Sequence, residues 1–530
     1  MQIVAEPANE AKPHLNFWYL PGLWIAVILG LAAFLRLFRL MSLFPILVDE
    51  SIYIRWAEII VHQGQWFISL LDAKQPLSYW IYALIRKLTP AADPLLGPRL
   101  VSVFAGLGST YLLYRLVRRL STERAGLIAA LLYAVLPFAV LFDRLAYTDA
   151  LVNFSSIALS YASVEYFGGE SRSWWGALSV GVIAGVGYSF KSTFALYAEL
   201  PVLAAMFFGR FRVTSAVRLG VIYAVAAVLP IISFLSVPDA PNFAVNNMLL
   251  HHTDFFVPME LLREQPLATL LNNGALAIGY TGSYLTYPFA IAAALAFLWL
   301  VHRRRRGACF LAILFLLPLS VEVLALWFLH SRYLFPLVWP LIVVLSIALA
   351  DMKRWFAAGL TLAVAGPMLI ASTAILRHPE RQLHPVDVSE FLSSGPFSGY
   401  GVSEAVAYVR KESEDGRPLT VLTDPSFGTP MDAIHAYLNL WNGIRVYDAW
   451  WLQMSDRPIL PKEPLQVMKS QYERVPAQVV DFPTLQRVYY ITDTNYNKPT
   501  DVTKREPTAR LEMRFEKRNG KDFVDVYRLR

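Results

Sequence analysis

The sequence has few charged residues and almost no cysteine. Only 16% of its 530 residues are Asp, Glu, Lys or Arg, whereas 56% are hydrophobic. Because the apolar residues come in long runs, this composition excludes a soluble protein of this length and indicates a polytopic helical membrane protein. The single cysteine, Cys309, excludes an intrachain disulfide.

Internal repeats and low-complexity segments are also absent from the sequence. The stretch from 380 onward has neither metal-ligand spacing nor a phosphate loop, and Gly428-Thr429-Pro430 is only a turn. The net charge is +7, which in a soluble chain would suggest nucleic acid as a partner. Here the basic residues lie in short loops between apolar runs, so membrane topology accounts for them and we expect no nucleic acid.

About 11 apolar runs are close to the length of about 20 residues that a helix needs to cross a bilayer. They lie near residues 20–40, 97–117, 124–142, 147–167, 174–190, 193–209, 216–237, 277–301, 308–329, 332–350 and 355–376. No small-residue cleavage site follows the first run. We therefore interpret it as an uncleaved anchor that follows a polar cytoplasmic segment, 1–18.

The basic residues support this arrangement, because cytoplasmic loops are enriched in Lys and Arg. Four basic clusters, with a weaker one at Arg172, fall on one side of the predicted spans: Arg115, Arg118, Arg119 and Arg124; Arg210, Arg212 and Arg218; Arg303 to Arg306; and Lys353 with Arg354. The prediction is an integral protein of a plasma or inner membrane, with a cytoplasmic N-terminus, a transmembrane domain over 19–379 and an extracytoplasmic first loop, 41–96.

Arg36 and Arg39 depart from the charge rule, because both lie near the outer end of the first span. Two interpretations fit them. Their side chains can reach outward to water, or they can face an anionic headgroup.

The tail, 380–530, is richer in charge and holds no apolar run long enough to span. Its pattern predicts a helix over 403–412, a buried strand over 419–423, a helix over 432–440, and strands at 445–447, 488–492 and 523–529. This alternation indicates a small extracytoplasmic α/β domain. By its position the domain covers a site or binds an acceptor, and a purely stabilising domain is the alternative.

Two adjacent carboxylates, Asp49 and Glu50, follow the first span directly. Ionisable groups near a membrane are costly and often functional, although an acid pair can also simply end a span in solvated interface. The residues from Tyr53 to Glu58 follow at near-helical spacing, which is typical of an amphipathic helix on the membrane surface. Asp49 at its start, where helix amides favour a carboxylate, is a candidate general base.

Four further charged groups lie on the predicted outer side. Lys74 lies in the interfacial group Asp72 to Trp80 and can contact a lipid phosphate or a bound one. Asp149 begins the fourth span, as an N-cap or as a functional acid. Lys191 follows the fifth span, as a topological stop or a phosphate ligand. Arg332 opens the tenth span against the charge rule and so requires a partner of negative charge.

Two pairs of neighbours admit simpler explanations. Asp143 and Arg144, in the turn between the third and fourth spans, can pair with each other. His251 and His252 lie in the 238–276 loop, where a structural role fits better than a metal site.

The order of these groups resembles the lipid-phosphosugar-dependent glycosyltransferases of the GT-C fold, in the group of protein O-mannosyltransferases, lipid A aminoarabinose transferases and lipopolysaccharide-core transferases. The resemblance covers about residues 20–380. It is carried by Asp49-Glu50 with Tyr53, by Lys74-x-Pro76-Leu77-x-x-Trp80, by Asp149 and Lys191, by a histidine in the outer loop, and by Arg332-Tyr333-x-x-Pro336.

The resemblance implies a polyprenyl- or dolichyl-phosphate sugar as donor, an extracytoplasmic acceptor in the form of a lipid, glycan or protein, and an inverting displacement. By position it implies catalytic roles for Asp49, Glu50 and Asp149. Its substrate-binding positions are Tyr53, Lys74, Lys191, His252, Arg332 and Tyr333. A divalent cation held by Glu50 and Asp149 is compatible with it but not required.

The sequence departs from the family pattern around Lys74. The family often has an acid directly before this lysine and two prolines after it, whereas Ala73 and Gln75 flank it here. Which acid takes the third carboxylate role is therefore left open.

Two other classes of protein compete with the transferase. A secondary transporter of an anionic or lipid-linked substrate would hold its charges near the middle of the bilayer, in two related halves, but here the charges gather at one interface. A membrane-anchored sensor with an outer ligand domain would leave the acids and lysines of the first loop unexplained.

Overall fold

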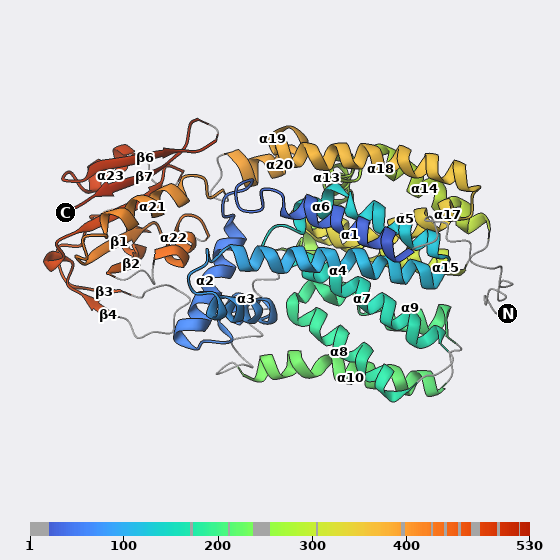
Figure 1. Ribbon diagram of the computed structural model, residues 1–530. Coiled ribbons are helices and arrows are strands. Elements are labelled where there is room, and N and C mark those ends of the chain that lie inside the picture. Colours follow the sequence, from blue (N-terminus) through green and yellow to red (C-terminus); the bar gives the residue numbers. More distant parts are fainter. Residues whose placement is uncertain are drawn as a thin grey trace.

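The computed structural model describes residues 21–169, 173–209, 213–236, 255–303, 306–393, 398–425, 428–438, 443–453, 457–467, 478–495, 499–518 and 520–530. Figure 1 shows two parts, a bundle of helices that holds the N-terminal and central chain, and a smaller part at the other end that holds the sheet and the C-terminus. The predicted segment 1–18, together with Arg172, Arg210 and Arg212, lies outside the described residues.

The bundle and its outer loops consist of helices of very different length. They are α1 (Pro21–Leu37), α2 (Val48–Gln63), α3 (Leu77–Leu88), α4 (Leu96–Leu120), α5 (Glu123–Ala134), α6 (Pro137–Phe142), α7 (Asp149–Gly168), α8 (Trp174–Phe190), α9 (Leu200–Phe207), α10 (Val213–Leu235), α12 (Met259–Glu264), α13 (Pro266–Tyr280), α14 (Tyr287–His302), α15 (Arg306–Ala325), α16 (Ser331–Leu334), α17 (Trp339–Ala350), α18 (Arg354–Arg377), α19 (Pro379–Gln382) and α20 (Pro385–Val388).

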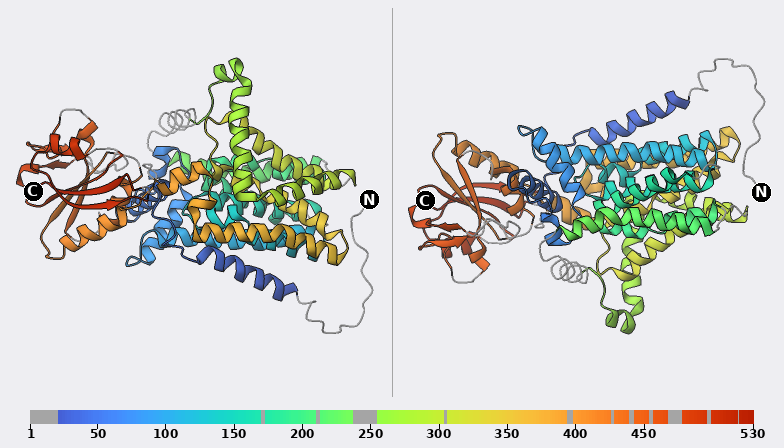
Figure 2. Two further views of the ribbon diagram at one scale, coloured as in Figure 1. Left: turned by 90° about the horizontal axis from the view of Figure 1, so that it is seen from above. Right: turned by 90° about the horizontal axis from the view of Figure 1, so that it is seen from below.

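Four of the described helices are long and apolar enough to cross a membrane, and up to six spans result if each of two bent pairs counts as one. One bent pair joins α13 to α14 at 107°, and in Figure 2 the α12–α13 segment projects away from the other helices. Large apolar side chains such as Phe104, Leu235 and Leu362 are exposed on the bundle, as expected of a surface in contact with lipid. The number of about 11 spans stays a prediction.

Proline divides two of the predicted spans. The run near 124–142 becomes α5 and α6, with the break before Pro137, and the run near 277–301 is interrupted at Thr286, shortly before Pro288. A residue that precedes proline is pushed out of the helical region, and proline itself supplies no backbone N–H. A prediction from hydropathy alone does not detect such breaks, because the residues on both sides are apolar.

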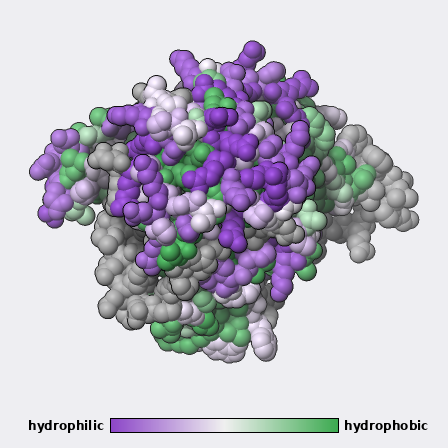
Figure 3. Space-filling model, turned by 90° about the vertical axis from the view of Figure 1, so that its left-hand side faces the viewer, coloured by the Kyte–Doolittle hydropathy of each residue, from purple (hydrophilic) through white to green (hydrophobic). Residues whose placement is uncertain are grey.

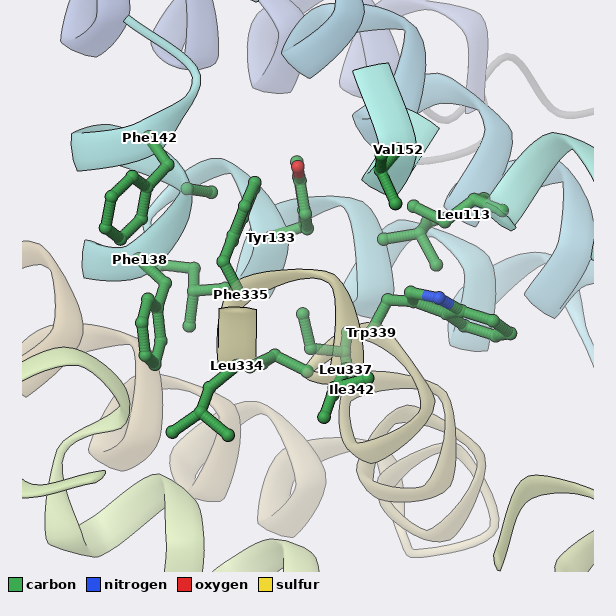
Figure 4. Close-up of a cluster of buried hydrophobic side chains, with 14 of the residues drawn as sticks. Leu113, Tyr133, Phe138, Phe142, Val152, Leu334, Phe335, Leu337, Trp339 and Ile342 are labelled. Carbon is green, nitrogen blue, oxygen red and sulfur yellow. The ribbon is translucent and has the colours of Figure 1, made fainter. Parts of the chain in front are cut away.

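The centre of the bundle is a cluster of buried aromatic and aliphatic side chains. Phe335 packs against Phe138 and Phe142, with ring centroids 6.3 and 5.7 Å apart, and Figure 4 shows Tyr133 and Trp339 in the same cluster. The indole N–H of Trp339 donates to Ser156 Oγ at 3.1 Å, so its polar atom is satisfied inside the core.

Arg36 corrects one expectation about the first span. Its side chain is fully buried and donates to Asp143 Oδ2 at 2.9 Å, so it reaches neither water nor a headgroup. Asp143 consequently does not pair with Arg144, which was the simple explanation for those neighbours. A buried arginine needs a carboxylate partner, and here the partner comes from 107 residues away.

The tail is an α/β domain, as predicted. Its sheet has the order β2-β1-β5-β7-β6, with β1, β2 and β5 parallel and β7 antiparallel to both β5 and β6. The strands are β1 (Leu419–Thr423), β2 (Ile444–Asp448), β5 (Val488–Asp493), β6 (Arg510–Glu516) and β7 (Phe523–Arg528), with β3 (Leu465–Val467) and β4 (Gln478–Val480) as a separate pair; the helices are α21 (Val402–Glu412), α22 (Met431–Leu438) and α23 (Pro499–Arg505). The face of this domain seen in Figure 3 is largely hydrophilic.

The tail and the first loop share one hydrophobic core. Ile46 and Ile54, from the first loop, are buried together with Val402, Val421 and other core residues of the tail, and in Figure 1 α22 lies beside α2. Gly428 is one point of close approach, because a Cβ built there would lie 2.2 Å from Val48 Cγ2. The tail therefore packs directly on the helix that carries Asp49.

Candidate active site

A cavity of about 620 Å³ lies where the ends of α2, α7, α8 and α15 meet the loop before α3 and α16. Seven of the nine residues proposed from the sequence line it: Asp49, Tyr53, Lys74, Asp149, Lys191, Arg332 and Tyr333. Glu50 does not line it, and His252 lies outside the described residues, as does His251. Asp49 and Arg332, which are 283 positions apart in the chain, thus meet in one cavity.

Asp49 stands in the first turn of α2, where unpaired helix amides favour a negative charge. Its Oδ2 accepts a hydrogen bond from Arg332. Burial raises the pKa of Asp49. The positive charge of Arg332, with smaller contributions from Lys74 and Lys191, outweighs burial and holds this pKa well below its usual range. Asp49 is therefore ionised at neutral pH, a requirement for a general base.

Glu50 points into the protein instead of into the cavity. Its two oxygens accept from Arg99 at 2.9 and 2.7 Å, from the backbone N–H of Ala146 at 2.7 Å, and from the backbone N–H of Leu47 at 3.0 Å. Both of its oxygens are occupied inside the core, so Glu50 is not available to a substrate or a metal. We therefore remove Glu50 from the candidate catalytic residues. Its role is structural, because its contacts with Arg99 and Ala146 fix the position of the first loop.

Lys191 and Asp149 form the second ion pair of the cavity. Lys191 Nζ lies 2.7 Å from Asp149 Oδ1 and 5.2 Å from the centre of the Tyr333 ring. The lysine has extended backbone at the break between α8 and the 3₁₀ segment Ser192–Tyr197, while Asp149 opens α7. The break in one helix and the start of another therefore bring the two charges together.

Lys74 forms the third pair, with Asp72 at 3.0 Å. Its ammonium group lies 5.4 Å from the ring centre of Tyr53 and 5.5 Å from that of Trp56, distances at which aromatic faces attract a cation. Ala73 between the pair adopts a left-handed conformation, φ 54°, which is costly for a residue with a Cβ. Asp72 lines the cavity, so it is the candidate for the third carboxylate that the sequence left open.

Arg332 is held in place through its neighbour in the chain. Its neighbour Ser331 donates to Asp387 Oδ1 at 2.9 Å, and Tyr284 donates to the other oxygen of Asp387. Burial raises the pKa of Asp387 to about 7. The guanidinium of Arg332 lies over the rings of Tyr147 and Tyr333, at 5.4 and 5.3 Å. The first residues of the tail thus fix the start of α16 and the direction of Arg332.

Glu322 is a cavity residue that the sequence analysis missed. It is buried on α15, and its Oε2 has no hydrogen-bond partner in the described part of the chain. Tyr197 also lines the cavity, and its hydroxyl likewise has no hydrogen-bond partner among the described residues. The signal was present, because a carboxylate inside a run as apolar as 308–329 is a functional candidate by default.

The charges of the cavity are nearly balanced. Arg332, Lys191 and Lys74 each pair with a carboxylate, so an incoming phosphate competes with Asp49, Asp149 and Asp72 for them. Within the described residues no group of three or more potential metal ligands comes together. The metal pair suggested by the sequence, Glu50 with Asp149, does not form a site because Arg99 and backbone amides occupy Glu50.

The fold is similar to that of solved GT-C glycosyltransferases, the group that the sequence resembles. Residues 73–236 match the model of the dolichyl-phosphate-mannose-protein mannosyltransferase family. This match covers less than half of the chain, and no curated relative matches its sequence.

Two solved structures give the likeness in fold. ArnT from Cupriavidus metallidurans, bound to undecaprenyl phosphate, is 13% identical with a TM-score of 0.61, and the match covers 95% of this chain and 97% of that one. The apo oligosaccharyltransferase of Archaeoglobus fulgidus is 12% identical with a TM-score of 0.55. There the match covers 81% of this chain but only 64% of the oligosaccharyltransferase, so this chain spans less than two thirds of that protein.

Proposed function

We propose that the protein transfers a sugar from a polyprenyl- or dolichyl-phosphate donor to an acceptor on the extracytoplasmic side of the membrane. One observation carries the proposal: the carboxylate of Asp49 is paired with Arg332 in a cavity that is also lined by Lys191 and Lys74. This is the set of charges that an activated acceptor and a phosphate leaving group require.

The donor enters with its phosphate toward the cations and its chain toward the apolar wall. Lys191 and Arg332 supply charge-assisted hydrogen bonds to the phosphate, and Lys74 adds a third positive charge. Phe190, Leu196 and Leu326 line the same cavity and suit a prenyl chain. ArnT, which shares the fold, is described in complex with undecaprenyl phosphate.

Donor binding prepares Asp49 for its role. In the free protein Arg332 lowers the pKa of this carboxylate and so weakens it as a base. When the donor phosphate shares Arg332, part of that positive charge is withdrawn and the basicity of Asp49 rises. A proton acceptor that becomes effective only with donor bound limits wasteful reaction with water.

The reaction is then a single displacement at the anomeric carbon. The acceptor hydroxyl or amine forms a bond to this carbon while the bond from the carbon to the phosphate oxygen breaks. The electron pair of that bond stays on the phosphate, where the cations stabilise it, and the acceptor proton goes to Asp49. The anomeric configuration is inverted. The tail, which packs on α2, covers the acceptor side.

The first test offers wild-type protein in membranes a panel of radiolabelled polyprenyl-phosphate sugars. Label that passes from one donor to a non-donor product establishes the reaction class, and the product identifies the acceptor. Unchanged donor that accumulates across sealed vesicles, without a new product, contradicts the transferase and supports the secondary transporter.

Replacing Arg332 by glutamine is expected to add an acid limb to the pH profile of kcat/KM. With Arg332 present, the lowered pKa keeps Asp49 ionised down to about pH 5, so its titration removes no activity between about pH 5 and 8. Without the arginine, the effect of burial is less opposed and the pKa of Asp49 rises. Activity then falls as the pH falls through the new pKa.

The exposed Arg417→Gln variant keeps the wild-type profile, and a flat profile in Arg332→Gln argues against Asp49 as the base.

Replacing Lys191 by glutamine is expected to raise the KM for the donor about ten- to a hundredfold, because one hydrogen bond to a charged group is lost. Asp149→Asn changes donor binding in the opposite direction, since it removes the carboxylate that competes for Lys191. Donor titrations of both variants test this, with the exposed Lys411→Gln as the matched control. A raised KM in both variants would contradict this, because it would indicate that the Lys191–Asp149 pair supports the shape of the cavity and that Lys191 does not bind the donor phosphate.

A further inference from the structure

A second charged site lies at the outer end of α1, away from the reaction cavity. Arg36 and Arg99 have carboxylate partners there, Asp143 and Glu50. Arg39, Arg144 and Arg377 lie in the same region, and among the residues that the structure describes no carboxylate pairs with any of the three. An excess of positive charge therefore remains at this place.

Arg144 is the most unusual member of this group. It is buried, donates to the backbone carbonyl of Phe38 at 2.6 Å, and leaves Nε and Nη1 without partners in the described residues. Burial, together with the like charges of Arg99 and Arg39, lowers its pKa to about 9. A buried cation without a counter-charge is costly, so a nearby anion would stabilise this region.

Arg39 and Arg377 line a pocket of about 370 Å³ between the ends of α1 and α18 and the hairpin of β6 and β7. Ser42, Tyr400, Glu516 and Arg518 belong to the same pocket. Arg518 is already paired with Glu380 at 2.9 Å and donates to the Tyr400 hydroxyl at 3.2 Å. Arg39 adopts a left-handed backbone conformation, φ 54°, and such a conformation outside glycine often accompanies function.

We propose that this pocket binds the phosphate of a net-anionic lipid headgroup in the outer leaflet. Arg39 and Arg377 form hydrogen bonds to the phosphate oxygens, and Ser42 and Tyr400 supply neutral hydroxyl donors. The negative charge also offsets Arg144, which lies close enough to Arg39 for the two charges to repel.

A lipid fits this place better than a free phosphate. The pocket lies at the ends of two apolar helices, and Phe34 of α1, Phe38 after it and Ile370 of α18 expose their side chains along the same helices. These side chains offer an apolar surface to acyl chains beneath the headgroup. The site shares no lining residue with the reaction cavity, so the inference does not depend on the proposed transfer reaction.

The test measures the thermal unfolding midpoint of delipidated full-length protein in detergent, titrated with phosphatidylglycerol, phosphatidylethanolamine or inorganic phosphate. Phosphatidylglycerol should raise the midpoint saturably. The double variant Arg39→Gln, Arg377→Gln should need at least about tenfold more of this lipid, because two charged donors are lost. Arg303→Gln, an exposed arginine at the opposite end of the bundle, should respond like wild type.

Two results overturn the inference. An unchanged phosphatidylglycerol titration in the double variant removes these arginines from lipid binding. An equal shift with inorganic phosphate, sensitive to the same two substitutions, assigns the pocket to a free phosphate instead of a lipid. Because both arginines are exposed, the double variant is expected to unfold near the wild-type midpoint without lipid. The variant Arg39→Lys with Arg377→Lys, which keeps the charges but not the paired donors, should bind with intermediate affinity.

Discussion

Replacing Asp49 by asparagine should lower the rate of sugar transfer by about a hundred- to ten-thousandfold, the usual effect of losing a general base. The amide keeps the shape of the carboxylate but cannot take the proton of the acceptor. Arg332, which donates to Asp49 in the free protein, retains an oxygen to donate to. The fold should therefore change little. Donor affinity should stay the same or rise, because the carboxylate that competes with the phosphate for Arg332 is gone.

The measurement is single-turnover transfer of radiolabelled sugar at saturating donor, together with a donor-binding titration. Asp501→Asn, an exposed carboxylate on α23, is the matched control and should transfer at the wild-type rate. If Asp49→Asn keeps more than about a tenth of the wild-type rate, Asp49 is not the base. Asp149 and Glu322, the other carboxylates deep in the cavity, would then be the next candidates.

Replacing Arg99 by leucine should reduce the free energy of unfolding by about 3–5 kcal/mol, because it leaves Glu50 charged, buried and unpaired. Arg99 also donates to the carbonyls of Leu40, Phe44 and Pro45 at 2.9, 3.1 and 2.8 Å. These groups shape the turn that leads into α2, so the variant should also lose transfer activity as the position of Asp49 relaxes.

Thermal unfolding in detergent measures this effect, and an exposed ion pair provides the contrast. Arg119→Leu breaks the pair with Glu165, whose side chains are 40% and 52% exposed, and should cost at most about 1 kcal/mol. Combining Arg99→Leu with Glu50→Gln should recover part of the loss, because no buried charge then remains. Equal midpoints for Arg99→Leu and Arg119→Leu would refute the structural role assigned to Glu50.

Asp49 and Glu50 illustrate what sequence alone can predict about the site. Both were expected to be functional, and nothing in the local sequence separates them. Successive residues of a helix point about 100° apart, so one carboxylate faces the cavity and the other the core. Which of them faces Arg99 depends on a helix that begins 46 residues later in the chain, and only the tertiary structure shows it.

The elements of the tail follow the same division. β1 and β5 are buried throughout, and their apolar runs predicted them at nearly the observed bounds. β6 is mostly exposed and rich in charge. It forms a strand because it pairs with β7, and its sequence has no hydrophobic pattern that would predict this. In the membrane part, Glu322 could have been found from the sequence, because it is a carboxylate within an apolar run. The pairing of Arg36 with Asp143 could not, because it joins residues that are distant in the chain.

The contact between Gly428 and Val48 has a consequence for engineering and for divergence among relatives. Gly428 has φ +78° and almost no space for a Cβ. The neighbour that fills this space is Val48 of α2, the residue before Asp49. The loop that holds Gly428 and the start of α2 must therefore match in shape. In a chimera that receives a foreign tail, the packing of the tail on α2 and the position of Asp49 should therefore change together. Exchanges that keep 41–63 and 398–438 from the same parent should stay active, and exchanges that separate these two segments should not.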